Sequence, residues 1–151
     1  MPNWCMNSVT LRHEDPNVIR EMVKKLEVME EHYLFRTLDP TWEYREAHEV
    51  DWSVDSDYSQ IDLSFDSAWS PPTELYETLE DQGWRVWATY YEPGLAFAGI
   101  YEDGDNNQYD DIFEITEEDI DSDEMLKEIV EQWNILDEIE AMRGWDDDED
   151  E

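Results

Sequence analysis

The net charge of the chain is the feature that most constrains how it folds. Its 151 residues include 43 acidic and 9 basic side chains, which give a formal net charge of −34. Repulsion at that charge opposes compaction, so a folded state needs a substantial apolar core. Hydrophobic residues make up 40% of the chain and include eight Trp and eight Tyr. This content predicts a single folded domain rather than a disordered chain.

The charge is concentrated in the last third of the chain. Residues 1–50 carry 10 acids and 6 bases, residues 51–100 carry 10 acids and 1 base, and residues 101–151 carry 23 acids and 2 bases. A surface of this kind repels nucleic acid and anionic membranes and attracts basic surfaces. A general need for solubility would not require such an uneven distribution, so we expect the acidic third to be a functional surface.

Several classes of protein are disfavoured by what the sequence lacks. Cys5 is the single cysteine, so no internal disulfide framework is expected. His13, His32 and His48 share no metal-binding spacing with one another or with Cys5. There is no glycine-rich phosphate loop and no G-x-S-x-G nucleophile motif. No apolar stretch resembles a signal peptide or a membrane span. We therefore expect a cytoplasmic protein that is not an enzyme and needs no cofactor.

Hydrophobic periodicity predicts an α+β order of elements. Alternating apolar residues predict strands at 3–11, 50–54, 61–65, 84–91 and 95–101, and helical spacing predicts helices at 16–31 and 71–82. Pro93 and Gly94 are typical of a type II turn between the last two strands. Residues 109–115 predict one further strand. The pattern over residues 33–48 is ambiguous.

Three segments carry a resemblance to a known family. They are Met1-Pro2-Asn3-Trp4-Cys5, Phe65-Asp66-Ser67-Ala68-Trp69-Ser70-Pro71-Pro72, and Glu92-Pro93-Gly94 with Phe97-Ala98-Gly99. With these segments, residues 1–102 resemble the YubB-type ferredoxin-like family of plasmid and phage proteins. The resemblance implies a ferredoxin-like βαββαβ sheet, here with extra hairpin strands, and a mobile-element setting. It implies no activity and no catalytic residues.

Beyond residue 102 we expect an acidic extension over 103–144 that packs on the same domain, and a flexible acidic tail at 145–151. Apolar spacing predicts an acidic helix over 123–143. The apolar stripe changes phase after Asn134, which leaves open whether the helix bends there or packs against something different. The second half of the stripe offers a possible homodimer contact through Ile135, Ile139 and Met142.

The acidic third favours a protein that mimics DNA. Its carboxylates would stand where a basic nucleic-acid-binding protein expects phosphates, so that the protein inhibits a host defence nuclease, restriction factor or repair factor. One alternative is a non-catalytic accessory domain that binds a protein or small ligand and is acidic by lineage. Another is halophilic adaptation. The residues expected to bind the partner are Glu117, Glu118, Asp119, Asp121, Asp123, Glu124, Glu128, Glu131 and Glu138.

One segment partly matches a calcium loop. Asp103, Asp105, Asn107 and Glu114 occupy ligand positions 1, 3, 5 and 12 of an EF-hand loop. Gln108 stands where the loop turn needs glycine, and the segment lies between expected strands rather than helices. We therefore expect a polar hairpin turn and no specific metal site.

Overall fold

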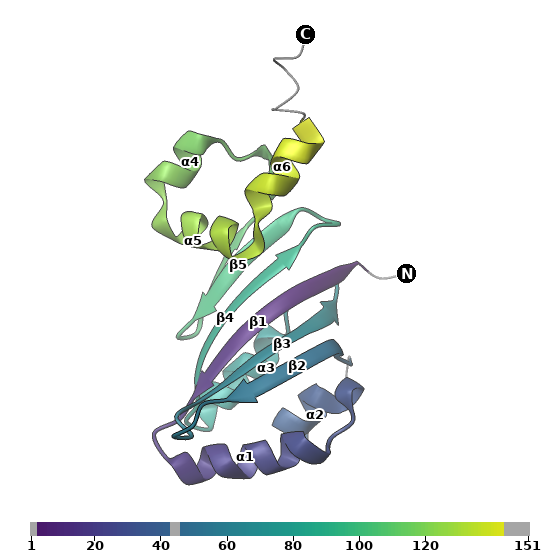
Figure 1. Cartoon of the computed structure of the whole chain (residues 1–151), viewed down its shortest axis with the longest axis vertical. Coiled ribbons are helices and arrows are strands. Elements are labelled where there is room, and N and C mark those ends of the chain that lie inside the picture. The colour runs from purple at the N-terminus through teal and green to yellow at the C-terminus, as the bar shows by residue number, and fades with distance from the viewer. Residues whose placement is uncertain (1–2, 43–45, 144–151) are drawn as a thin grey trace.

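A mixed α+β architecture is seen in the computed structural model, which describes residues 3–42 and 46–143. Over these residues six antiparallel strands form one sheet, in the spatial order β2-β3-β1-β4-β5-β6 (Figure 1). The strands are β1 (Trp4–Arg12), β2 (His48–Val54), β3 (Gln60–Ala68), β4 (Arg85–Glu92), β5 (Phe97–Glu102) and β6 (Asp105–Tyr109).

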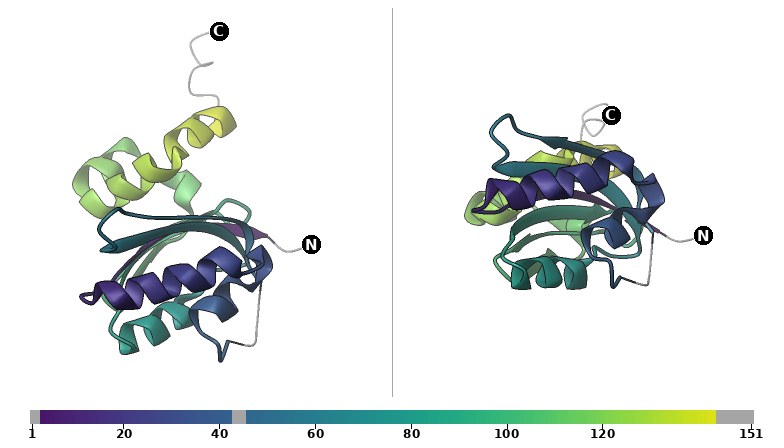
Figure 2. Two further views of the ribbon diagram at one scale, coloured as in Figure 1. Left: turned by 60° about the horizontal axis from the view of Figure 1, so that its bottom comes forward. Right: turned by 90° about the horizontal axis from the view of Figure 1, so that it is seen from below.

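The strand β1 sets the two faces of the sheet. Val9 lies opposite Leu63 of β3 and Ala88 of β4, and all three are buried on one face. The neighbouring position, Thr10, lies opposite Trp87 on the other face, because side chains alternate along a strand. The sheet therefore has two faces with different coverings (Figure 2).

The first face is covered by the helices that lie between the strands in sequence: α1 (Pro16–Val28), α2 (Leu34–Leu38) and α3 (Thr73–Asp81). Asp15 caps α1 by accepting a hydrogen bond from the Asn17 backbone at 2.9 Å, as expected for an N-cap followed by proline. The ambiguous segment after α1 contains α2 and the short 3₁₀ helix η1 (Glu31–Tyr33). Residues 43–45 of that segment lie outside the described residues.

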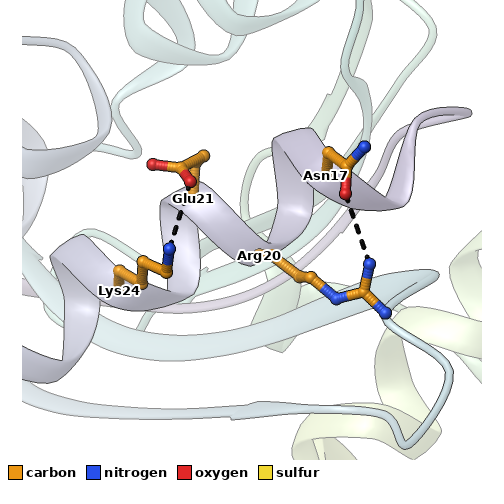
Figure 3. A network of polar contacts seen from close by, with 4 residues as sticks. All are labelled: Asn17, Arg20, Glu21 and Lys24. Atoms are coloured by element: carbon orange, nitrogen blue, oxygen red, sulfur yellow. Dashed lines mark hydrogen bonds and ion pairs between the residues drawn. The ribbon is translucent and has the colours of Figure 1, made fainter.

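The exposed side of α1 carries charges of both signs. Lys24 pairs with Glu21 at 3.3 Å, and Arg20 donates from Nη1 to Asn17 Oδ1 at 3.3 Å (Figure 3). This is the mixed pattern of an ordinary solvent-facing helix.

The second face is covered, over β4 and β5, by η2 (Ile112–Glu114), α4 (Glu117–Ser122), α5 (Glu124–Trp133) and α6 (Ile135–Arg143). These elements share a hydrophobic core with Tyr91, Ala98 and Ile100 of the sheet. The predicted helix over 123–143 is therefore two helices, because Asn134 adopts a left-handed conformation (φ 54°) that ends α5.

Two local predictions are wrong. The β4–β5 connection is not a type II turn at Pro93-Gly94, because Ala96 rather than Gly94 has a positive φ (61°). A Cβ at position 94 would lie 2.7 Å from Asn3 Cγ, so any other residue there would displace the Asn3 side chain. The strand expected at 109–115 is instead the polar strand β6, followed by η2.

Among the described residues, no helix combines the length and the apolar character that crossing a membrane requires.

Candidate functional site

The acidic helices are fixed to the sheet by polar contacts as well as by apolar packing. Trp133 of α5 donates its indole N–H to Thr89 Oγ1 of β4 at 3.0 Å. Tyr109 of β6 donates its hydroxyl to Asp123 Oδ2 at 2.8 Å, and Tyr91 of β4 donates to Glu138 Oε1 of α6. Each of the three contacts joins a helix end or helix face to a strand, so the layer is held in one position.

The pKa values of Tyr91 and Tyr109, which donate to carboxylates of the acidic helices, are both raised. Partial burial, followed by the nearby Asp123 carboxylate, raises the pKa of Tyr109 to about 12. Burial and the Glu138 carboxylate likewise raise the pKa of Tyr91 well above its ordinary value. At neutral pH both phenols therefore remain hydrogen-bond donors to the acidic layer.

The helix α4 is built around a reciprocal cap. The Asp119 backbone donates to Thr116 Oγ1 at 3.1 Å, and the Thr116 backbone donates to Asp119 Oδ2 at 2.9 Å. This capping box satisfies two backbone donors at the helix start. Glu117 and Glu118 lie in the same first turn, where negative charge is favoured by the helix dipole. The Thr-x-x-Asp spacing is a sequence signal that predicts such a cap.

The helix α5 separates its apolar and acidic residues by face. Asp123 caps it by accepting from the backbones of Met125 (3.1 Å) and Leu126 (3.2 Å). Leu126, Ile129 and Val130 are buried against the sheet.

The nine acids expected to bind a partner fall into two groups. Asp119, Asp123 and Glu138 are structural, since the side chain of each accepts a hydrogen bond from the start of its own helix or from a tyrosine of the sheet. The other six are exposed and, among residues 3–42 and 46–143, have no hydrogen bond or ion pair from their side chains. We call these the free acids: Glu117, Glu118, Asp121, Glu124, Glu128 and Glu131.

The spacing of the free acids on α5 follows from helix geometry. Glu124 and Glu128 are one helical turn apart, which is about 6 Å along the axis, and Glu131 follows about 4.5 Å further on. Successive phosphates of a DNA strand have a similar separation, given a rise of about 3.4 Å per nucleotide and the sideways path of the backbone. A rigid row of carboxylates with this spacing is the arrangement that a cationic cleft for DNA would accept.

Two of the three residues expected to form a homodimer contact are buried inside the protein. Ile135 and Ile139 are both 0% exposed and belong to the core between α6 and the sheet. Only Met142 is exposed, at 65%. This part of the apolar stripe is buried in the protein's own core, which joins η2, α4, α5 and α6 to the sheet.

The partial calcium motif is dispersed along a hairpin. Asp103 and Gly104 form the tight turn between β5 and β6, with φ of 51° and 85°. Asp105 and Asn107 lie along β6, and Glu114 lies beyond it on η2. Within the described part of the chain, no three His, Cys, Asp or Glu side chains are grouped to hold a metal ion.

Sequence analysis also missed acids on the uncovered half of the second face. Asp62 and Asp66 of β3 lie on this face, as does Asp51 of the neighbouring strand β2. Asp51 and Asp62 line a shallow cavity of about 250 Å³. Burial, followed by the charge of Glu49, raises the pKa of Asp66. The alternation of Asp62, Ser64 and Asp66 along one strand is the signal that predicts this face.

Comparisons with family models, with curated proteins and with solved structures found no match to this chain. The resemblance of residues 1–102 to the YubB-type family therefore remains a prediction.

Proposed function

We propose that this protein is an acidic DNA mimic that binds a basic nucleic-acid-binding protein and blocks its cleft. The natural partners in a phage or plasmid setting are host defence nucleases, restriction factors and repair factors, met in the cytoplasm of the host cell. The observation that carries the proposal is the row of free acids on α4 and α5. They are exposed, and they belong to helices anchored to the sheet.

Rigidity is what distinguishes this surface from an acidic tail. A flexible segment must be ordered when it binds, which costs conformational entropy. The backbone of α5, which carries these acids, is already fixed by the Asp123 cap and the Trp133–Thr89 hydrogen bond. Binding therefore costs less backbone entropy per charge here than on a flexible acidic segment. The acidic tail expected at 145–151 lies outside the described residues.

The proposal extends to the fold of residues 1–102, for which we propose a ferredoxin-like unit. Its support is the chain order β1-α1-β2-β3-α3-β4 together with the spatial order β2-β3-β1-β4. In this view β5 is an extra hairpin strand of that unit, and β6 and α4–α6 are an extension of the same domain that presents the free acids.

The test is competition with duplex DNA. Immobilised protein should capture its partner from host lysate, and added duplex DNA should release it. Replacing Glu124, Glu128 and Glu131 by Lys should weaken binding by ~1–3 kcal/mol for each desolvated charge pair lost. Added salt should also weaken binding, because the contacts are between exposed charges.

The matched control reverses three exposed acids on the opposite layer, namely Glu74, Glu77 and Asp81 of α3. It changes the net charge by the same amount, so equal losses from both triple variants would mean that overall charge, not the α5 surface, drives binding. Deletion of residues 146–151 should matter less than the α5 reversal, although it removes six acids. Circular dichroism checks that every variant is folded. Failure of DNA to compete would contradict mimicry.

An accessory binding domain is the second candidate, and Trp69 favours it. This side chain is 51% exposed although its backbone has φ of 70°, a conformation that costs a bulky residue free energy. Strain retained at an exposed aromatic residue is typical of binding surfaces. If this candidate holds, Trp69→Ala abolishes partner capture, and duplex DNA does not release the partner.

A further inference from the structure

A cavity of about 300 Å³ opens on the second face of the sheet, beside the last residue of β1 and the first residue of β4. It is separate from the free acids. Its lining combines positive, negative and aromatic side chains: Thr10, Arg12, Arg85, Val86, Trp87, Glu102 and Asp103.

Two of the nine basic residues of the chain meet in this cavity. Arg12 and Arg85 are directly opposite each other in the antiparallel register of β1 and β4. Like charges in that position repel each other. Across residues 3–42 and 46–143, neither guanidinium is in an ion pair, although acids outnumber bases almost fivefold in the chain. Both guanidiniums therefore line the cavity without an ion pair, together with the carboxylates of Glu102 and Asp103.

The orientation of Arg12 is set by a chain of hydrogen bonds. Its Nε donates to Gln60 Oε1 at 2.9 Å, and Gln60 Nε2 donates to Asp62 Oδ1 at 3.0 Å. Asp62 also accepts from the Thr10 hydroxyl at 3.1 Å. Because the Nε–H is occupied on the Gln60 side, the two terminal nitrogens of Arg12 remain to bind a ligand. A guanidinium held in this way recognises a tetrahedral oxyanion by two parallel hydrogen bonds.

The other residues that line the cavity suit a ligand that carries an aromatic ring and hydroxyl or amino groups in addition to an oxyanion. Trp87 is half-buried and packs against the core under α4–α6, so it offers a fixed aromatic wall. Glu102 and Asp103 are exposed carboxylates that accept hydrogen bonds from hydroxyl or amino groups. The volume is at the lower end of the range for ligand pockets.

We propose that this cavity binds a nucleoside monophosphate. The phosphate lies between Arg12 and Arg85, the base stacks on Trp87, and the sugar hydroxyls donate to Glu102 and Asp103. Stacking on an aromatic residue is tolerant of base identity, so the site accepts several bases. The net charge of −34 opposes the approach of any anion. Screening weakens the contribution of charges more than about 8 Å away at physiological ionic strength, so the repulsion that the two guanidiniums must offset comes mainly from nearby carboxylates such as Glu102 and Asp103.

The experiment is calorimetric titration of the full chain with adenosine 5′-monophosphate, adenosine and inorganic phosphate, all at one ionic strength. The nucleotide should bind at one site, and both fragments should bind at least about tenfold more weakly. Arg85→Gln should lower the affinity for the nucleotide about tenfold, which is about 1.4 kcal/mol. Arg12→Gln should have an effect of similar size.

The control variant is Arg20→Gln, which removes an exposed arginine of α1 that bonds Asn17 outside the cavity (Figure 3). It should leave nucleotide affinity unchanged. The proposal is overturned if the nucleotide does not saturate a site, if Arg20→Gln lowers affinity as much as Arg85→Gln, or if phosphate binds as tightly as the nucleotide. The last result would leave the aromatic wall and the carboxylates without a role.

Discussion

The helices α1 and α5, one from each helical layer, bury apolar residues in the same way and differ in the balance of charge on their exposed sides. In the first layer, α1 buries Ile19 and Leu26 against the sheet and mixes Lys24 with Glu21 on its exposed side. In the second layer, α5 buries Ile129 and its neighbours in the same way, and its exposed side carries three acids against one base, Lys127. Apolar burial therefore explains why both layers fold, and it does not explain the acids of the second.

The second layer compensates its repulsion with additional polar contacts to the sheet. Tyr91 and Tyr109 both donate to carboxylates of that layer, whereas the first layer has one described contact of this kind, from Tyr101 to Glu80 at 2.6 Å. The comparison separates acids whose side chains hold the layer in place by hydrogen bonds from acids whose side chains make no such contact. Only the latter are candidates for function.

The largest expected effect comes from breaking the apolar contact of each layer in turn. Ile19→Ala and Ile129→Ala each remove a fully buried side chain and should lower the free energy of unfolding by ~2–5 kcal/mol. Added sodium chloride should restore more stability to Ile129→Ala, because salt screens the repulsion concentrated in the second layer. Urea unfolding at low and high salt measures both effects.

Hydrogen exchange of the same variants sharpens the comparison. In Ile129→Ala, amides of α5 and α6 should exchange faster while those of β1 and β3 stay protected, since local opening follows local stability. Equal loss of protection throughout both layers would contradict the view that the second layer opens independently of the first.

A smaller effect should separate structural from free acids within the second layer. Asp123→Ala removes the α5 cap and the acceptor of Tyr109, so it should cost ~1–3 kcal/mol in spite of the relief of repulsion. Glu131→Ala should be neutral or slightly stabilising, because Glu131 lies in the last turn of α5, where a negative charge is disfavoured. Thermal unfolding of the two variants at equal ionic strength measures the difference. If Glu131→Ala lowered the stability as much as Asp123→Ala, the distinction between structural and free acids would be contradicted.

Much of the fold could be predicted from local patterns. The α+β class and six-strand sheet rest on alternation such as Ile61, Leu63 and Phe65, which the structure places on β3 with all three side chains buried. The strand β6 was missed at its true position because it is polar throughout and lies at the sheet edge, where no face is deeply buried. The short helix α2 has too few residues for a period to be read.

The sites could not be predicted from local sequence patterns, because they depend on which strands pair and on how the helices pack against the sheet. The opposition of Arg12 and Arg85 requires the pairing of β1 with β4, which are more than 70 residues apart in the chain. The burial of Ile139 requires knowing that α6 folds back on its own sheet. Similarly, the acids at Asp123 and Glu138 look the same in sequence as the free acids, and only their contacts with Tyr109 and Tyr91 separate them.

The smallest predicted effect is alkaline weakening of the second layer. The pKa of Tyr109 is about 12 in the folded protein and 10.0 as its ordinary value, so the folded state keeps a proton that the unfolded state loses. The contribution is therefore fully present below pH 10 and is lost as pH rises through about 12. At higher pH the Tyr109 phenolate faces the Asp123 carboxylate, and two negative groups replace a hydrogen bond.

Amide exchange of α5 relative to α1 should accelerate over this pH range. Tyr109→Phe should weaken that pH dependence, because it removes one titrating group, whereas Tyr58→Phe, which changes a tyrosine packed beside the first-layer core, should leave it unchanged. An identical acceleration in both variants would show that general alkaline repulsion, and not the tyrosine–carboxylate bond, opens the layer.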